Sequence, residues 1–140
     1  MLGPLEFMQP YTPYLALLLR IWVGVNMIGH GYPKIGKGRK QTVDAMKGLG
    51  VPAVAVYLVA ILEFFGGLGL IIGFLVPIIA LFIAIEMVAN SILKATKMKG
   101  SYLSGQNPAA YEIDITYLML AIVLLVLGAG VLSIDAIVGL

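Results

Sequence analysis

The sequence predicts an all-α integral membrane protein, a bundle of four spanning helices. Of its 140 residues, 61% are hydrophobic and 11% are charged, and the mean hydropathy is +1.03. A soluble domain of this size has no need of so much apolar surface, whereas a membrane domain does. The length allows one membrane domain, residues 1–140, and no second module. The net charge of +2 is too small to indicate a nucleic-acid partner, so the expected surrounding is a lipid bilayer.

Four apolar stretches, each of about 18–23 residues, are long enough to cross a hydrocarbon core of roughly 30 Å. Pro13, Pro52 and Pro77 mark the starts of the first three, because a proline's missing N–H would be unpaired there anyway. Asp114 caps the fourth stretch or lies in its first turn. The predicted spans are residues 14–31, 53–75, 77–95 and 114–132.

The connections between the spans differ in length. Gly29, Gly31 and Pro33 are predicted to end the first helix. The turn between the second and third spans is only residues 73–77, so these two spans form a tight antiparallel hairpin. The other connections are longer and polar, and residues 44–49 fit a short surface helix. Ser133 and Asp135 have the spacing of a cap on a short final helix.

Basic residues indicate the orientation, because eight of the nine lie in or beside two connections that fall on one side of a four-span protein. The positive-inside rule places these two loops in the cytoplasm and both termini outside. The expected location is therefore the cell membrane, crossed several times. The eight residues are Lys34, Lys37, Arg39, Lys40, Lys47, Lys94, Lys97 and Lys99.

Three ionisable residues, Arg20, Glu63 and Glu86, lie inside apolar spans. Charges at that depth are costly, usually paired, and typical of functional sites. At about 1.5 Å per residue, Arg20 and Glu86 fall in an outer layer with Asp135 near its mouth. This pair either fixes helix register or also moves protons or binds a headgroup.

An inner layer is predicted to gather Glu63, Asn26 and His30. The only cations expected near the depth of Glu63 are His30 and the more distant Lys34. A carboxyl group with so little charge compensation suits proton exchange. His30, the only histidine, is either a proton carrier and donor to a quinone carbonyl or a membrane-edge side chain bonded to backbone. Lys34 is either part of this cluster or a topology anchor at the cytoplasmic boundary.

Absent cysteines exclude disulfides, thiolate metal sites and iron–sulfur ligation. No metal site is expected. A haem held by His30 is a minor alternative, and its second ligand would come from Met87, Met119 or another subunit.

Several short motifs occur in an order that resembles the DoxX/DoxD family of small four-helix membrane proteins. They are Arg20, Gly29-His30-Gly31-Tyr32-Pro33-Lys34, Gly50-x-Pro52, Glu63-x-x-Gly66-Gly67, Glu86 and Gly128-x-Gly130-x-x-Ser133-x-Asp135. The family's usual Gly-Pro-Gly before the final Ser-x-Asp is Gly-Ala-Gly here.

This resemblance implies a link to respiration and to sulfur or oxidative-stress metabolism. Family members are associated with terminal quinol oxidases and with thiosulfate:quinone oxidoreductase, in which a DoxD-type subunit works with a DoxA-type partner. The site residues that it implies are Arg20, His30, Lys34, Glu63, Glu86 and Asp135.

The resulting prediction is a redox-linked membrane subunit that binds a quinone or quinol and exchanges protons through His30 and Glu63. Because the chain has no cysteine, electrons must come through a partner, a bound quinone or a haem. The expected partners are other membrane or redox subunits, or further copies of the chain. Two alternatives remain open: a non-catalytic accessory or assembly subunit of a terminal oxidase, and a small-solute or proton transporter.

Overall fold

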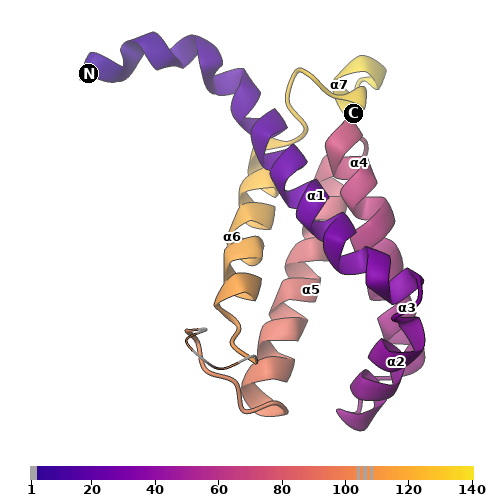
Figure 1. The fold of residues 1–140 in the computed structure, drawn as a ribbon. Helices are drawn as coiled ribbons and strands as arrows, with labels where there is room; N and C mark the ends of the chain where they lie inside the picture. Colours follow the sequence, from indigo (N-terminus) through magenta and orange to yellow (C-terminus); the bar gives the residue numbers. More distant parts are fainter. Residues whose placement is uncertain (1–2, 104, 106, 108) are drawn as a thin grey trace.

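The computed structural model describes residues 3–103, 105, 107 and 109–140. Within these residues the chain folds into helices and contains no strand, which confirms the predicted all-α class (Figure 1). The elements in order are η1 (Gly3–Tyr14), α1 (Leu15–Ile35), α2 (Arg39–Gly48), α3 (Ala53–Ile61), η2 (Leu62–Gly66), α4 (Gly67–Ile72), α5 (Val76–Thr96), α6 (Glu112–Leu127) and α7 (Ile134–Val138).

The predicted second span is a continuous helical segment that contains one π turn. Helix α3 passes into the π turn η2, which passes into α4. The predicted hairpin follows at once, since Gly73 with φ of +73° ends α4 and Leu75 with φ of +52° precedes α5. A π turn inserts an extra residue into a helix and is frequent at functional sites. This one contains Glu63.

The bundle consists of two packed pairs of helices. Helix α1 packs along α3, η2 and α4, while α5 packs along α6. Glycines allow the first pair to approach closely: a Cβ on Gly67 would lie 2.7 Å from the carbonyl oxygen of Gly24, and one on Gly24 would lie 2.6 Å from that of Gly67. Small residues permit this backbone contact between membrane helices. The space between the two pairs is where the candidate site lies.

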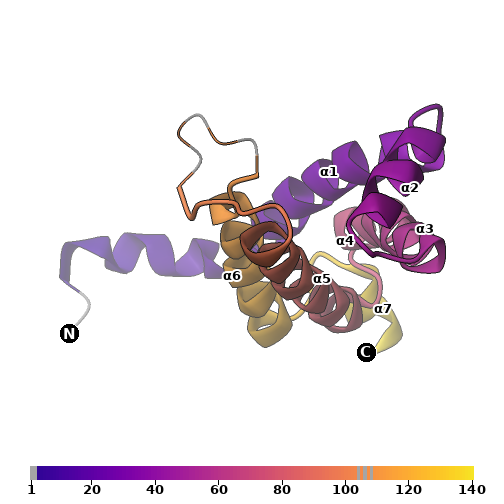
Figure 2. The same ribbon diagram turned by 90° about the horizontal axis from the view of Figure 1, so that it is seen from below.

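The two ends of the bundle differ in character. Helix α2 and the end of α5 lie at one end, and η1 and α7 lie at the other (Figures 1 and 2). The basic loops therefore share one end, which we call the basic end, as the sequence predicted. That this end faces the cytoplasm stays a prediction.

Three segments are long and apolar enough to cross a membrane: Pro10–Ile35, Ala53–Ile72 and Val76–Thr96. Helix α6 has 16 residues and ends at Leu127, where Gly128 has φ of +70°, rather than at residue 132. At 1.5 Å per residue it is about 24 Å long, shorter than a typical span of roughly 20 residues. The fourth crossing stays a prediction.

The expected end of the first helix at Gly29–Pro33 is wrong, because α1 continues to Ile35. Gly31 lies against the backbone of η2, where a Cβ would be 2.6 Å from the nitrogen of Phe64. Packing against a second helix thus overrides the helix-ending tendency of the glycines and of Pro33. The extra turn places Lys34 on a helix instead of in a loop.

Candidate functional site

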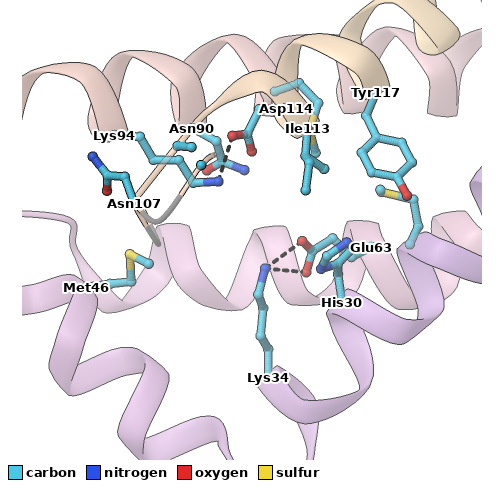
Figure 3. Close-up of a pocket in the computed structure, with 14 residues that line it drawn as sticks. His30, Lys34, Met46, Glu63, Asn90, Lys94, Asn107, Ile113, Asp114 and Tyr117 are labelled. Carbon is cyan, nitrogen blue, oxygen red and sulfur yellow. Dashed lines mark hydrogen bonds and ion pairs between the residues drawn. The ribbon is translucent and has the colours of Figure 1, made fainter. Parts of the chain in front are cut away.

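A cavity of about 560 Å³ lies between the two helix pairs, toward the basic end. Figure 3 shows its two walls, one from α1, α2 and η2 and the other from α5, α6 and the connection between them. Its volume falls within the roughly 300–1,000 Å³ of small-molecule sites. The described residues that line it are Met27, His30, Lys34, Met46, Glu63, Met87, Asn90, Lys94, Gly105, Asn107, Ala110, Ile113, Asp114 and Tyr117.

An ion pair between Lys34 and Glu63 forms one wall of the cavity. The Nζ of Lys34 donates to both carboxylate oxygens of Glu63, at 2.5 and 2.6 Å. The Glu63 side chain is 3% exposed and that of Lys34 is 23% exposed. Glu63 therefore depends on Lys34 to balance a charge that has almost no contact with solvent.

Two local features bring this pair together. The π turn η2 carries Glu63, and the close contact of Gly31 with η2 brings the last turn of α1 alongside it. A Cβ on Gly31 would also lie 3.0 Å from the Cβ of Glu63. Any larger residue at position 31 would push Lys34 away from the carboxylate that it neutralises.

Glu86 on α5 is the second buried carboxyl group of this cluster. It lies within electrostatic reach of Glu63 and Lys34, and Asn90 donates to its Oε1 at 3.3 Å. Its Oε2 is buried without a hydrogen-bond partner among the described residues. Because a second carboxyl group, that of Glu63, is its neighbour, a proton on one of the two acids would supply a donor.

A second ion pair stands on the facing wall of the cavity. Lys94 near the end of α5 donates to Oδ2 of Asp114 in the first turn of α6, at 2.6 Å. The Asp114 side chain is 9% exposed and that of Lys94 is 28% exposed. The cavity thus lies between two Lys–carboxylate pairs (Figure 3).

His30 reaches the cavity from α1 without a hydrogen bond to any described residue. Its ring meets that of Tyr117 edge to face, with the centroids 6.1 Å apart and the planes at 85°. Met27 and Met87 line the same space. A polarizable apolar floor with one free imidazole suits a flat ring that carries a hydrogen-bond acceptor.

The expected Arg20–Glu86 pair is not formed, because Arg20 belongs to the other end of the bundle. Its Nη2 donates to the carbonyl of Leu132 at 2.6 Å and its Nη1 to that of Leu70 at 3.3 Å. Leu70 lies in the last turn of α4, where its carbonyl also accepts from the nitrogen of Gly73 at 3.2 Å. The C-terminal end of a helix attracts cations. Arg20 thus meets these carbonyls and the charge of Asp135 instead of Glu86.

Asp135 holds this opposite end together. Its Oδ1 accepts from the backbone nitrogen of Leu75 at 2.7 Å, and its Oδ2 accepts from that of Val76 at 2.9 Å. Its own nitrogen donates to the carbonyl of Gly73 at 2.9 Å. The predicted cap by Ser133 is confirmed, since Ser133 Oγ accepts from the nitrogen of Ala136 at 3.1 Å. Asp135 thus caps α5 as well as lying in α7.

Asn26 does not join the inner layer with Glu63 and His30. Its Nδ2 donates to the carbonyl of Trp22, one turn back on α1, at 2.7 Å, and it does not line the cavity. Sequence reasoning missed Lys94, Asp114 and Tyr117. Glu86, Asn90 and Lys94 are spaced four residues apart on α5. Helical periodicity therefore indicates that they share one face, and this pattern could have predicted Lys94 as a lining residue.

The sequence model of the DoxX family matches residues 15–93 of this chain, which is more than half of it. The chain belongs to the DoxX family. The match runs from the start of α1 almost to the end of α5, so it contains His30, Lys34, Glu63 and Glu86. Asp114 and Asp135 lie beyond it.

Two relatives of this DoxX protein extend the comparison beyond the matched segment. One, "Inner membrane protein YqjF" of Escherichia coli (strain K12), is 33% identical over 119 residues, covering 85% of this chain and 88% of the relative. Another, "Putative oxidoreductase CatD" of Bacillus subtilis (strain 168), is 26% identical over 119 residues, covering 85% and 83%. No solved structure matches.

No group of three or more histidine, cysteine or carboxylate side chains suited to a metal ion occurs in the described part of this DoxX protein. His30 and Met87 line one cavity, whereas Met119 is 51% exposed. The polar groups around the cavity are ammonium, carboxylate, imidazole and amide. They suit an organic ligand with carbonyl or hydroxyl oxygens.

Proposed function

We propose that this protein is a redox-linked membrane subunit that binds a quinone or quinol in the cavity and exchanges its protons through His30 and Glu63. The observation that carries the proposal is the buried cluster of Lys34, Glu63 and Glu86 on the cavity wall. A relative bearing the name of an oxidoreductase supports a redox role.

The charges of this cluster suit proton transfer. Two carboxyl groups share one ammonium, so the cluster is neutral only when one carboxyl carries a proton. The buried, unpartnered Oε2 of Glu86 offers the position for that proton. A proton that moves between Glu63 and Glu86 therefore crosses the wall without an isolated charge in the apolar interior.

The fit to a quinone ring follows from the rest of the lining. Met27, Met87 and Tyr117 supply apolar contact for a flat ring, while His30 and Asn90 offer hydrogen bonds to its oxygens. Reduction of a quinone to a quinol takes two electrons and two protons. In the proposal the protons pass through His30 and Glu63, and the electrons come from a separate redox subunit because this chain has no cysteine.

The test uses the complex that copurifies with the chain from its native membranes. Glu63→Gln keeps the shape of the side chain and removes its proton exchange, so we expect quinone turnover to fall by roughly 10²-fold or more. Asp44→Asn is the matched control, because Asp44 is exposed on α2 and does not line the cavity. Blue-native electrophoresis checks that assembly is unchanged.

The outcomes separate the alternatives. If the Glu63→Gln complex assembles and turns over within twofold of the parent, the proton-exchange role is wrong. If the assembled complex needs the chain but the chain binds no quinone, it is an accessory subunit. A visible spectrum of the purified protein tests the haem alternative, for which a Soret band is required.

A further inference from the structure

A second cavity, of about 230 Å³, lies beside the polar one and is bounded by α2, α3, α5 and the residues just before α3. We call it the annex. Apart from Lys34, Thr42, Glu86 and Asn90, its lining is apolar: Met46, Val51, Ala55, Val56, Val59, Ala89 and Leu93. Its volume is below the roughly 300 Å³ of a self-contained ligand pocket, so it suits one part of a larger molecule.

The annex adjoins the polar cavity. Lys34, Met46 and Asn90 line both spaces. Glu63 faces the polar cavity, and Glu86 faces the annex. The buried acid cluster therefore stands where the polar space changes into the apolar one.

The annex lies between α3 and α5, which belong to different helix pairs. Helix α3 packs on α1 and α2, whereas α5 packs on α6, η2 and α4. The halves of α3 and α5 nearest the basic end consequently diverge, as Figures 1 and 2 show. Ala89 in the annex lining is exposed at the protein surface, so the space between α3 and α5 opens sideways, toward the lipid of a surrounding bilayer.

We propose that the annex holds the first isoprenoid units of a tailed quinone whose ring occupies the polar cavity. This inference rests on the proposed function and adds the class of its ligand: a membrane-dissolved amphiphile that enters sideways between α3 and α5. The apolar lining, the shared wall and the lateral opening match a polar ring joined to an apolar chain. The remainder of the chain continues into lipid, because the annex is too small for a whole tail.

The test fills the annex and compares two ligands with the same ring, menadione and its farnesylated derivative. Ala55→Phe and Ala89→Phe place an aromatic ring in the annex. Their neighbours serve as matched controls, since Val54 is 67% exposed and Val88 is 43% exposed and neither lines a cavity. Binding is measured in nanodiscs, and the ligand concentration is expressed per lipid. The different partitioning of the two ligands into the bilayer then does not affect the comparison of their affinities.

We expect Ala55→Phe and Ala89→Phe to weaken binding of the farnesylated ligand at least tenfold and that of menadione less than twofold. Val54→Phe and Val88→Phe should leave both affinities unchanged. Should a phenylalanine variant fail to fold, Ala→Leu at the same position supplies a smaller filling group with the same expected direction.

Two results would refute the assignment of the annex to the isoprenoid tail without contradicting the proposed function. In the first, menadione binds the parent but filling the annex leaves the farnesylated ligand unaffected. In the second, filling weakens both ligands equally, which places the ring itself in the annex. If neither ligand binds the parent protein, the proposed quinone site fails, and the annex assignment fails with it.

Discussion

Loss of the Lys34 ammonium should destabilise the protein through Glu63. The Lys34→Met substitution keeps most of the apolar stem and removes the charge. Glu63, whose side chain is 3% exposed, then loses both of its hydrogen bonds from Lys34. Its carboxylate remains in an apolar interior beside Glu86, a second acid that offers no compensation.

The magnitude follows from burial. Breaking a buried ion pair by removing one partner costs about 3–5 kcal/mol. Because Lys34 is 23% exposed, solvent screens part of the interaction, and we expect the lower limit, about 3 kcal/mol. That is a roughly hundredfold change in the folding equilibrium. Glu63→Met should cost less, since a freed lysine can extend its ammonium to water.

Equilibrium unfolding in mixed micelles of the parent, both single variants and the double variant Lys34→Met/Glu63→Met measures these effects. Replacing a whole buried pair by apolar groups is often neutral, so the double variant should be more stable than Lys34→Met, with a coupling energy of about 2–3 kcal/mol. Lys37→Met, at an exposed lysine, is the control and should lie within about 0.5 kcal/mol of the parent.

Two results would refute this reasoning. One is a Lys34→Met protein as stable as Lys37→Met, which would mean that Glu63 finds compensation elsewhere. The other is a double variant whose loss equals the sum of the two single losses, which would mean that the two side chains do not interact.

Further predictions concern helix packing and the two other polar groups. Gly29→Ala should stabilise the protein by about 0.5–1 kcal/mol, because a Cβ at this position meets nothing within 4 Å. Gly31→Ala should destabilise it by about 1–3 kcal/mol, because its Cβ would lie 2.6 Å from the η2 backbone. Thermal unfolding compares the two variants, and equal effects would contradict the close packing at Gly31. Asp135→Ala should cost about 2–4 kcal/mol, since it removes the two hydrogen bonds that cap α5 and the negative charge near the buried Arg20. Limited proteolysis should show this as cleavage between α4 and α5, and an unchanged digest would count against this role. Lys94→Met should weaken binding of menadione by threefold or more and cost about 2 kcal/mol of stability, less than Lys34→Met, because the Asp114 side chain that loses its partner is 9% exposed and lies in the first turn of α6, where the helix N-terminus offsets part of its charge. An unchanged dissociation constant would show that this wall does not contact the ligand.

Hydropathy and proline positions predicted most of the helical architecture. Apolar run lengths located α5 almost to the residue, and the short turn before it followed from Gly73 and Pro77. The π turn was not predicted, and its close contact with Gly31 of another helix cannot be read from residues 62–66 alone. The extension of α1 past Pro33 was missed for the same reason.

The three ionisable residues inside the predicted spans are all buried in the structure. Their interaction partners, however, could not be predicted from their depth along each helix. Depth along each helix placed Arg20 near Glu86. A guanidinium, however, also binds backbone carbonyls, and Arg20 donates to those of Leu70 at the end of α4 and of Leu132. Lys34 joined Glu63 only because α1 gained a turn.

Arg20 and Lys34 lie on the same helix, about 21 Å apart at 1.5 Å per residue, and their surroundings assign them different kinds of role. Arg20 is fully buried, fixed by two backbone carbonyls and by Asp135, and lines neither cavity. It joins α1 to the α4–α5 turn and to the segment before α7. A charge held in this way fixes the positions of these segments relative to one another.

The Lys34 cluster instead borders both cavities and contains one more acid than base. Its spare acid, Glu86, has an oxygen without a donor in the described structure. Packing alone gives no reason for a second buried carboxyl here, because a neutral glutamine would satisfy Asn90 and spare the bundle a like-charge contact. A proton-exchange site needs that carboxyl, so Glu86→Gln should stabilise the fold while slowing the quinone reaction. Equilibrium unfolding and turnover of this one variant, measured side by side, therefore separate a structural cluster from a catalytic one: a variant that is less stable and fully active would assign Glu86 to structure.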